Sequence, residues 1–196
     1  KFNLINLKSL NRYEITTVSI HMQDYFTRKF NKNIFQIPNG INSKVFYFDN
    51  KIKVVKKSIL YVGRLVDFKG VKNILEASKK LYDFHFTFIG AGPLLNSIQS
   101  NNVTFLGQKK SSELPYFYNS AFISIFASEY ENYPLVGLEA MACGSVVLAN
   151  KIKGFQEYIE NESNGFLADL TTSDLIVESI RKISAYKNIN NIKENA

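Results

Sequence analysis

Two pairs of charged residues have types and spacings that could bind phosphate and hydroxyl groups. In the first pair, Arg64 follows Gly63 at the end of an apolar run, and Lys69 stands just before Gly70. A glycine lets backbone approach a ligand closely, an arginine offers a planar fork to phosphate oxygens, and a lysine adds a point charge. A helix beginning at Val71 would add free N–H groups and a positive dipole. These groups could hold a diphosphate, and a tight turn with two solvated cations explains the same residues equally well.

The second pair consists of two glutamates, Glu131 and Glu139, with seven residues between them. Pro134 marks the start of a helix, so Glu131 lies in the loop beside the amino end of that helix and Glu139 lies more than a turn inside it. A carboxylate on a helix that otherwise faces the core costs stability unless it finds a partner, and a ribose diol could donate two hydrogen bonds to it. When Glu139 is considered alone, a solvent-facing helix position is the simpler explanation.

Both pairs lie beside elements of an alternating pattern that runs from residue 58 onward. Short apolar runs predict strands at Ser58–Gly63, Phe84–Ile89, Val103–Leu106, Ala121–Phe126, Ser145–Ala149 and Gly165–Leu167. Helical spacing predicts helices at Val71–Leu81, Leu135–Cys143 and Thr172–Tyr186, and shorter ones from Pro93 and from Ser111, with Ser111 or Ser112 as cap. The alternation predicts an α/β fold, a Rossmann-like parallel sheet with helices on both faces. Ligands bind at the carboxyl ends of such strands, where both charged pairs lie.

The first fifty residues break this pattern. Glu14–Ser19 and Ile34–Ile37 have the composition of short strands, His21–Phe30 that of a helix, and the Lys-rich segment Asp49–Lys57 that of a linker. We therefore expect two parts, residues 1–50 and residues 51–196.

Composition excludes several classes of protein. Hydrophobic residues make up 45% of the 196 residues, too many for a disordered chain, and the single Cys143 cannot form an intramolecular disulfide. No apolar run approaches the roughly 20 residues that cross a bilayer. The net charge of +7 rests mostly on lysine, which A/T-rich coding DNA also favours, so it indicates either a solvated basic surface or a polyanionic partner. The chain lacks the aromatic-basic motifs of RNA-binding modules, and we expect no nucleic-acid partner.

Several ordered motifs resemble those of one enzyme family, the retaining glycosyltransferases with the GT-B fold of the family 4 or group 1 type. Glu131 and Glu139 match the Glu-x7-Glu motif of that family. The other matching segments are Ile37–Ile41, Tyr61–Leu65 with Lys69-Gly70, Phe88–Pro93, Val103–Gly107 and Glu139–Gly144. The match spans most of the chain. It implies that residues 51–196 are the carboxyl-terminal, nucleotide-sugar-binding domain and that residues 1–50 are a remnant of the amino-terminal domain with the interdomain connector.

The resemblance implies a role for each charged residue. Arg64 and Lys69 would bind the donor diphosphate and stabilise it as a leaving group, Glu139 would hold the donor ribose, and Glu131 would support charge near the transferred sugar. We thus expect Arg64, Lys69 and Glu131 to be catalytic. Backbone groups would complete the donor site at Gly63, Gly90, Gly92, Gly107, Leu135 and Val136. The sequence has no Asp-x-Asp motif, and the resemblance implies no metal ion and no cofactor apart from the nucleotide-sugar substrate.

Three positions depart from the family pattern. Asn132 stands where glycine is usual, Ser145-Val146 where a proline is often found, and Lys153 where a common Gly-Gly-x-x-Glu loop has its first glycine. These departures leave the diphosphate and ribose contacts in place, but they obscure which sugar the donor carries.

The sequence thus predicts the donor-binding half of a retaining hexosyltransferase, which transfers a sugar from a nucleotide-diphosphate sugar to a saccharide or lipid-linked acceptor. Because the acceptor-binding half of such enzymes is missing from this sequence, we expect donor binding with little or no transfer from this chain alone. The alternative is a non-catalytic nucleotide-sugar-binding module that acts with a separate acceptor-binding chain. We expect a cytoplasmic protein, with peripheral contact to the inner face of the membrane through its basic surface.

Overall fold

The computed structural model describes residues 13–96 and 100–196. Contacts divide the chain into two compact units, one that ends at Gly40 and one that extends from Ile41 to Ala196. The smaller sheet belongs to the first unit and the larger sheet to the second.

The first unit is a strand, a helix and a strand. β1 (Thr16–Thr17) pairs in parallel with β2 (Phe35–Gln36), and α2 (Ile20–Phe30) connects them. A parallel pair needs a crossover connection, which this helix supplies. Asn31 ends the helix in left-handed backbone, with φ of 48°. The predicted order of elements is confirmed, with each strand shorter than expected.

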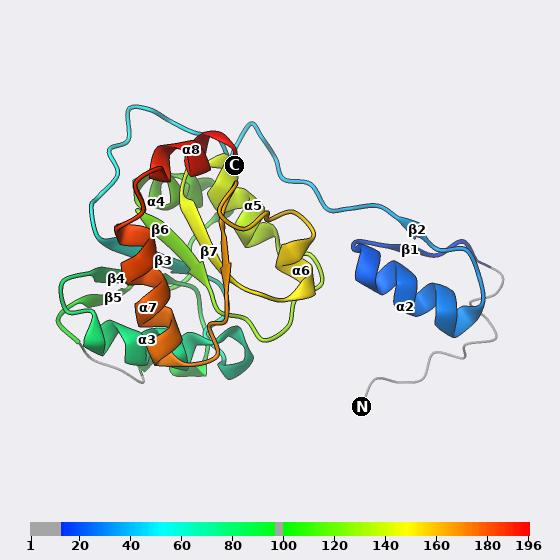
Figure 1. Ribbon diagram of the computed structural model, residues 1–196, viewed down its shortest axis with the longest axis horizontal. Helices are drawn as coiled ribbons and strands as arrows, with labels where there is room; N and C mark the ends of the chain where they lie inside the picture. The colour runs from blue at the N-terminus through cyan, green and yellow to red at the C-terminus, as the bar shows by residue number, and fades with distance from the viewer. Residues whose placement is uncertain (1–12, 97–99) are drawn as a thin grey trace. The chain divides into compact units, whose positions relative to one another are not determined.

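The second unit is built around a six-stranded sheet in which all neighbouring strands are parallel. The strand order is β5-β4-β3-β6-β7-β8 (Figure 1). The strands are β3 (Ser58–Val62), β4 (His85–Ile89), β5 (Val103–Phe105), β6 (Ile123–Phe126), β7 (Val146–Asn150) and β8 (Phe166–Ala168). Each begins and ends within two residues of its predicted run, so the predicted parallel α/β sheet is confirmed.

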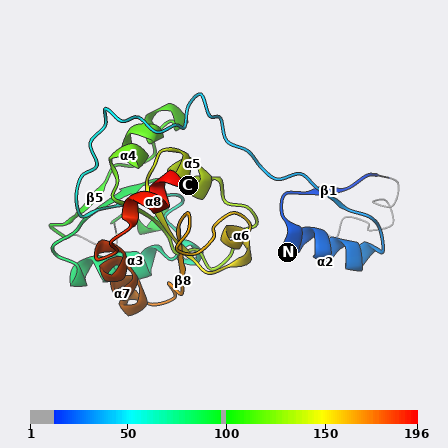
Figure 2. The ribbon, with the colours of Figure 1, turned by 45° about the horizontal axis from the view of Figure 1, so that its top comes forward.

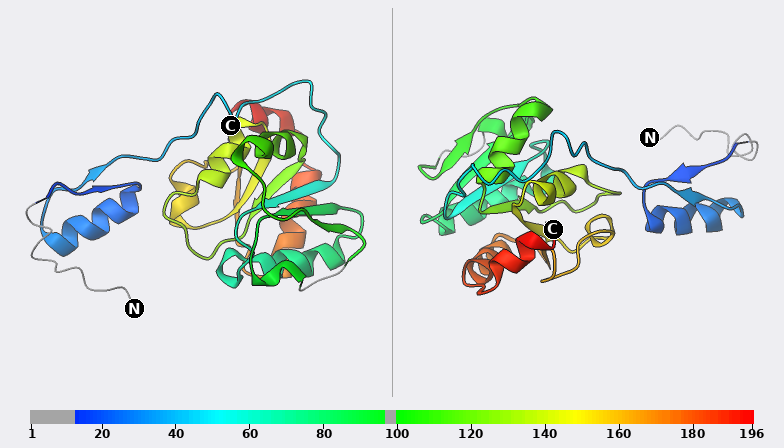
Figure 3. Two further views of the ribbon diagram at one scale, coloured as in Figure 1. Left: turned by 180° about the vertical axis from the view of Figure 1, so that it is seen from behind. Right: turned by 90° about the horizontal axis from the view of Figure 1, so that it is seen from above.

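Side chains alternate along the strands and supply one apolar layer to each face of the sheet. On β3, Ile59 and Tyr61 belong to one layer, and Leu60 and Val62 to the other. The first layer packs against α3 (Val71–Lys80), α7 (Ser173–Ser184) and α8 (Ile189–Glu194); the second packs against α4 (Leu114–Ser120), α5 (Leu135–Ala142) and α6 (Lys153–Gln156). Figures 2 and 3 show this arrangement, with α3 and α7 side by side. Burial of both faces explains why the strands are almost continuously apolar.

The helices depart from the prediction in three ways. The short helices α6 and α8 have no counterpart in the predicted pattern, because neither is long enough to show a helical period. The helix expected from Pro93 is, in its described part, the 3-10 turn η2 (Pro93–Asn96). The 3-10 turn η3 (Ser111–Glu113) precedes α4, and neither serine caps it; instead the Lys110 N–H donates to Glu113 Oε2 at 2.8 Å. No helix in the described part of the chain is long and apolar enough to cross a membrane.

The second unit begins at Ile41, ten residues before the start that the sequence predicts. Phe46 is buried, with its ring centroid 6.2 Å from that of Tyr118. The Asp49 N–H donates to Asn119 Oδ1 at 2.8 Å, and Asn119 Nδ2 donates to the carbonyl oxygen of Tyr47 at 3.0 Å. The lysines that follow are exposed and resemble a linker, but these long-range contacts join the segment to α4.

Replacing a glycine with alanine can cost stability in two ways, through strain at a positive φ and through a clash of the added Cβ. Three glycines of this chain differ in which of these costs apply. Gly70 has a φ of 71°, and a Cβ there would lie 2.2 Å from the carbonyl oxygen of Ala127. Gly107 has a φ of 67° with no atom within 4 Å of that position, and Gly40 has neither constraint. We expect Gly70→Ala to lower the free energy of unfolding by more than about 2 kcal/mol, Gly107→Ala by about 1 kcal/mol and Gly40→Ala by less than about 0.5 kcal/mol.

Urea unfolding followed by circular dichroism measures the three values. Equal losses for Gly70→Ala and Gly107→Ala would mean that the contact with Ala127 does not constrain the loop.

Candidate active site

The expected site residues surround the point where the strand order reverses, between β3 and β6. β4 and β5 extend the sheet from β3, whereas β7 and β8 extend it from β6. The helix after β3 is α3, which covers one face, and the helix that follows the β6 loop is α5, which covers the other. Loops that leave two neighbouring strands for opposite faces diverge, and parallel sheets bind ligands at such positions.

Close backbone packing joins the loops that follow β3 and β4. A Cβ on Gly90 would lie 1.9 Å from the carbonyl oxygen of Gly63, and a Cβ on Gly92 would lie 2.3 Å from that of Leu65. The Gly63 N–H donates to the carbonyl oxygen of Ile89 at 3.0 Å. Glycine is therefore required at positions 90 and 92 by the packing of one loop on the other, a reason that the sequence alone does not reveal.

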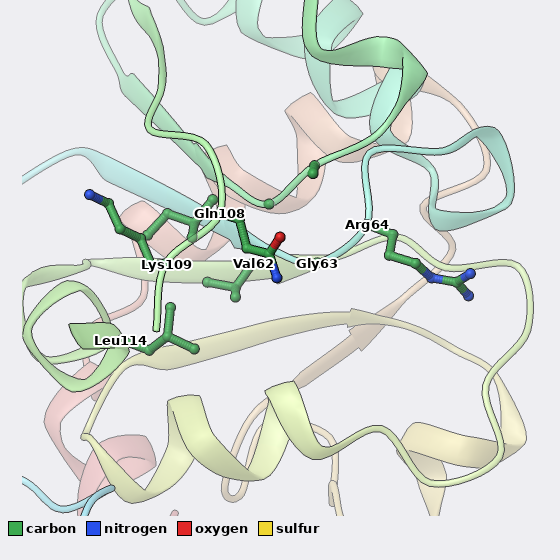
Figure 4. A pocket seen from close by; sticks show the side chains of 9 residues that line it. Val62, Gly63, Arg64, Gln108, Lys109 and Leu114 are labelled. Carbon is green, nitrogen blue, oxygen red and sulfur yellow. The ribbon is translucent and has the colours of Figure 1, made fainter. Parts of the chain in front are cut away.

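A cavity of about 230 Å³ opens at these loop ends. In Figure 4, Lys109 and Leu114 lie at one end of the cavity, the Arg64 side chain lies at the other, and the Gln108 amide lies between them beside Val62. The remaining lining residues are Val62, Gly63, Ile89, Gly90 and Ala91. Of the expected site residues, the cavity is lined by Gly63, Arg64 and Gly90; its lining does not include Lys69, Gly92, Gly107, Glu131, Leu135, Val136 or Glu139. Sequence reasoning missed Gln108, Lys109 and Leu114, whose only signal is their position just after the third predicted strand.

Two aromatic residues organise the basic loop, and sequence reasoning missed both. The Phe68 ring centroid lies 5.2 Å from Arg64 Cζ and 5.6 Å from Lys69 Nζ, within the range of a cation–π contact. The buried Tyr61 hydroxyl donates to the carbonyl oxygen of Arg64 at 2.7 Å. Burial raises the pKa of Tyr61, and the Glu131 carboxylate acts in the same direction, so the hydroxyl remains a donor at neutral pH. The signals available in the sequence are the position of Phe68 beside Lys69 and a tyrosine within an apolar strand.

The structure brings Lys69 and Glu131 together from different strand ends. Lys69 Nζ forms an ion pair with Glu131 Oε1, and the two side chains are 17% and 16% exposed. The same carboxylate oxygen accepts a hydrogen bond from Ser128 Oγ at 2.9 Å. A backbone hydrogen bond from the Glu129 N–H to the carbonyl oxygen of Phe68, 2.9 Å long, joins the two loops. Two residues that were expected to be catalytic are therefore in direct contact, although 62 positions separate them along the chain.

The amino end of α5 and the loop before it are held against α6 and the residues that follow α6. Tyr158 Oη donates to the carbonyl oxygen of Pro134 at 2.7 Å, just before Leu135 and Val136 begin the helix. The first N–H groups of a helix have no partners within the helix, so those of Leu135 and Val136 can donate to groups outside α5. A Cβ on Gly154 would lie 2.3 Å from the carbonyl oxygen of Glu131, so α6 approaches this loop closely only because glycine stands there.

Glu139 has a partner that the sequence did not predict. The fully buried Tyr118, on α4, donates from its hydroxyl to Glu139 Oε2 at 3.1 Å. Burial raises the pKa of Glu139, and the hydrogen bond from Tyr118 opposes that rise. Glu139 is therefore a half-buried carboxylate inside the second layer, not a fully solvated helix residue.

The expected absence of a metal ion remains a prediction. In the described residues, no group of three or more histidine, cysteine, aspartate or glutamate side chains is arranged to hold a metal ion.

Residues 43–196 match the family described as glycosyl transferases group 1, which is more than half of the chain. The chain belongs to this family. The match covers the second unit almost completely and includes every residue expected to bind the donor. The predicted family and its Rossmann-like fold are confirmed.

Individual relatives agree with this assignment. The chain is 27% identical over 180 residues to an uncharacterized glycosyltransferase of Methanocaldococcus jannaschii, covering 88% of this chain and 50% of the relative. It is 26% identical over 182 residues to the UDP-Gal:alpha-D-GlcNAc-diphosphoundecaprenol alpha-1,3-galactosyltransferase of Escherichia coli. This alignment covers 81% of this chain and 47% of the relative. The solved carboxyl-terminal domain of a group 1 glycosyl transferase from Francisella tularensis superposes with a TM-score of 0.67 at 26% identity. The superposition covers 80% of this chain and 94% of the solved domain. The chain thus corresponds to a carboxyl-terminal domain and spans about half the length of the curated relatives it matches.

The raised pKa of Glu139 gives this carboxylate a definite effect on stability. An acid whose pKa is higher in the folded than in the unfolded protein binds more protons when folded, so its ionisation lowers stability as the pH rises between the two pKa values. We expect the wild-type chain to lose stability relative to Glu139→Gln as the pH rises above the ordinary pKa of glutamate, because glutamine still accepts from Tyr118 without becoming charged.

Urea unfolding of both proteins between pH 4 and pH 8 gives the difference in the free energy of unfolding at each pH. A difference that does not change with pH, or one that favours the wild type as the pH rises, would contradict the expected effect of burial on Glu139.

Proposed function

We propose that this chain is the donor-binding half of a retaining hexosyltransferase, which transfers a sugar from a nucleotide-diphosphate sugar to a saccharide or lipid-linked acceptor. The observation that carries the proposal is the Lys69–Glu131 ion pair at the β3–β6 switch point of a group 1 glycosyl transferase domain, with Arg64 and Lys69 both beside the Phe68 ring. Two cations beside a carboxylate suit a substrate that has a diphosphate next to a sugar.

The diphosphate would lie between the Arg64 and Lys69 side chains and the free N–H groups at the start of α5. The nucleoside would occupy the cavity, whose apolar residues Leu114, Val62 and Ile89 suit the faces of a base. Its ribose would donate hydrogen bonds to Glu139. This arrangement is supported by α4, which supplies both Leu114 to the cavity and, one turn later, the Tyr118 that contacts Glu139.

In the transfer step, the bond between the sugar and the diphosphate breaks, a bond forms between the sugar and an acceptor hydroxyl oxygen, and the hydroxyl proton passes to the leaving phosphate. Negative charge grows on that phosphate as the first bond breaks. Arg64 and Lys69 would stabilise that charge, and the Glu131 carboxylate would stabilise the positive charge that develops on the sugar. Because Glu131 contacts the same lysine that would bind the leaving phosphate, it lies on the leaving-group side of the sugar. A base for inversion would have to act from the opposite side, and so would a nucleophile that forms a covalent sugar intermediate. This position therefore supports a role for Glu131 in stabilising charge while the acceptor approaches from the leaving-group side, which gives retention. We propose that neither a metal ion nor another cofactor takes part, since the two cations supply the charge.

The acceptor would be bound by a second domain, as the length of the relatives suggests. The alignment with the M. jannaschii protein covers 88% of this chain, which is more than residues 43–196 contain, so it includes part of the first unit. We propose that the unit ending at Gly40 is the last strand and helix of this acceptor-binding, amino-terminal domain. The E. coli relative is named for a lipid-linked acceptor. A lipid-linked acceptor would bring the protein to a membrane, where its exposed lysines would favour peripheral contact with anionic headgroups.

Substitution of the two cations tests the proposed donor site. We expect the wild-type chain to bind at least one of UDP, GDP and ADP, and Arg64→Ala with Lys69→Ala to weaken that binding about 100-fold or more, because each charge-assisted hydrogen bond contributes about 1.5–3 kcal/mol. Isothermal titration calorimetry measures both constants. The control is Lys72→Ala, which removes a lysine that is exposed and paired with Asp67 at 2.9 Å. Unchanged binding in the double variant, or an equal loss in the control, would refute the site.

The Tyr118–Glu139 contact predicts how the ribose is recognised. Without the tyrosine hydroxyl, α4 no longer fixes Glu139 Oε2, and a carboxylate that must be ordered when the ribose binds contributes less net affinity. We expect the wild type to prefer the ribonucleotide over its 2′-deoxy or 3′-deoxy form by about ten-fold, and Tyr118→Phe to reduce this preference to about three-fold or less. Calorimetry with each nucleotide pair measures the ratio. Tyr116→Phe, at an exposed tyrosine of the same helix, should retain the wild-type preference. If Tyr118→Phe also retained the wild-type preference, the assignment of Glu139 to the ribose would be contradicted.

A further inference from the structure

We infer that Glu131 makes the site favour the intact donor over the nucleoside diphosphate that remains after transfer, because it competes with phosphate for Lys69. The inference rests on the proposed function and extends it from what the site binds to how the site distinguishes substrate from product.

Glu131 and Lys69 form a partly buried and well-fixed pair. Both side chains are less than one fifth exposed, and the carboxylate oxygen that meets Lys69 also accepts from Ser128 Oγ at 2.9 Å. Ser128 is itself only 3% exposed. Its carbonyl oxygen accepts from Nδ2 of the buried Asn150 at 3.0 Å. The loop is therefore held from β7, and the carboxylate has little freedom to leave its position beside the lysine.

The backbone on the other side of Glu131 is confined as well. Only glycine fits at position 154, because a Cβ there would lie 2.3 Å from the carbonyl oxygen of Glu131. Gly154 is the one glycine that remains of the Gly-Gly-x-x-Glu loop noted in the sequence, and Lys153 takes the place of the other. The fixed position of Glu131 means that a ligand must adapt to the carboxylate rather than displace it.

A phosphate that binds Lys69 takes the cation away from Glu131. A partly buried carboxylate that loses its cation keeps the cost of its desolvation and gains a repulsive neighbour in the phosphate. A nucleoside diphosphate offers only acceptors in this region, so it cannot replace the lost partner. The transferred sugar of the donor carries hydroxyl groups, which can donate to Glu131 where Lys69 did.

The donor and the diphosphate product therefore differ in what Glu131 gains when it loses Lys69. With the donor, Glu131 exchanges a lysine for sugar hydroxyls and remains hydrogen-bonded. With the diphosphate product, Glu131 loses the lysine and gains no donor from the ligand. The pair thus weakens product binding selectively, which would speed release of the nucleoside diphosphate once the sugar has left.

Glu131→Gln tests this inference, because it removes the charge and keeps the shape of the side chain. In calorimetric titrations, we expect the variant to bind the nucleoside diphosphate about ten-fold more tightly than the wild type, the effect of one charged contact. The affinity for the corresponding nucleotide sugar should rise by less than about two-fold, so the preference for donor over product falls by about five-fold or more. The titrations use UDP and UDP-glucose, GDP and GDP-mannose, and ADP and ADP-glucose, each on the full 196-residue chain.

Two further variants separate the pair from general charge effects. Glu129→Gln makes the same change at an exposed neighbour in the same loop and should leave the preference unchanged. Ser128→Ala keeps the charge and removes the hydrogen bond that fixes Glu131, and it should reduce the preference in the same direction as Glu131→Gln by a smaller factor. Circular dichroism melting curves identify any variant that is unfolded.

The outcomes distinguish this inference from the proposed function. If the wild type binds none of the nucleotides, the proposed function fails. If it binds them but Glu131→Gln tightens both ligands equally, weakens both, or matches Glu129→Gln, the donor site stands and the selective role of Glu131 is overturned.

Discussion

The site depends on one close contact, the packing of the β3 loop against the β6 loop where the strand order reverses. Gly70 allows it, because a Cβ at that position would collide with the backbone of Ala127. The hydrogen bond from the Glu129 N–H to the carbonyl oxygen of Phe68 then fixes the register of the two loops. Without this contact, Lys69 and Glu131 would remain on separate loops, each a solvated charge. The chemistry of the site thus follows from the topology of the sheet combined with one residue that has no side chain.

The sequence predicts this topology well because the signal is physical and local. Strands buried on both faces must be almost continuously apolar, and the intervening helices must carry an apolar stripe, so each strand was predicted to within two residues. The boundary of the second unit was predicted ten residues too late for the opposite reason. Its first residues are fixed by Phe46 and by hydrogen bonds to Asn119, contacts with a helix some seventy residues away that leave no local pattern.

The candidate site was predictable as a set of residues but not as a set of contacts. Arg64, Lys69, Glu131 and Glu139 were found through motif resemblance, since their types suit a diphosphate and a ribose. That Lys69 pairs with Glu131, and Tyr118 with Glu139, depends on which way each side chain leaves its loop or helix. Spacing along the chain carries no information on that direction when the partners come from different elements. The hydroxyl groups of Tyr61 and Ser128, which fix the backbone of Arg64 and the carboxylate of Glu131, escaped notice for the same reason.

The charge of the molecule illustrates how such contacts change a conclusion drawn from composition. A net charge of +7 indicates either a solvated basic surface or a polyanionic partner. Many of the cations are exposed and already paired with carboxylates, among them Lys57, Lys72, Lys79, Lys80, Arg181 and Lys182. Such surface pairs contribute little energy and attract no particular ligand. At the site itself, Lys69 is paired with Glu131, so one of the two cations is already neutralised by a carboxylate. In the proposed transfer, a strongly positive site would bind the nucleoside diphosphate product tightly and release it slowly. By the inference above, a site whose lysine is already paired binds a nucleoside diphosphate more weakly than it would without the carboxylate, and the sugar of the donor offsets that loss by donating to the carboxylate.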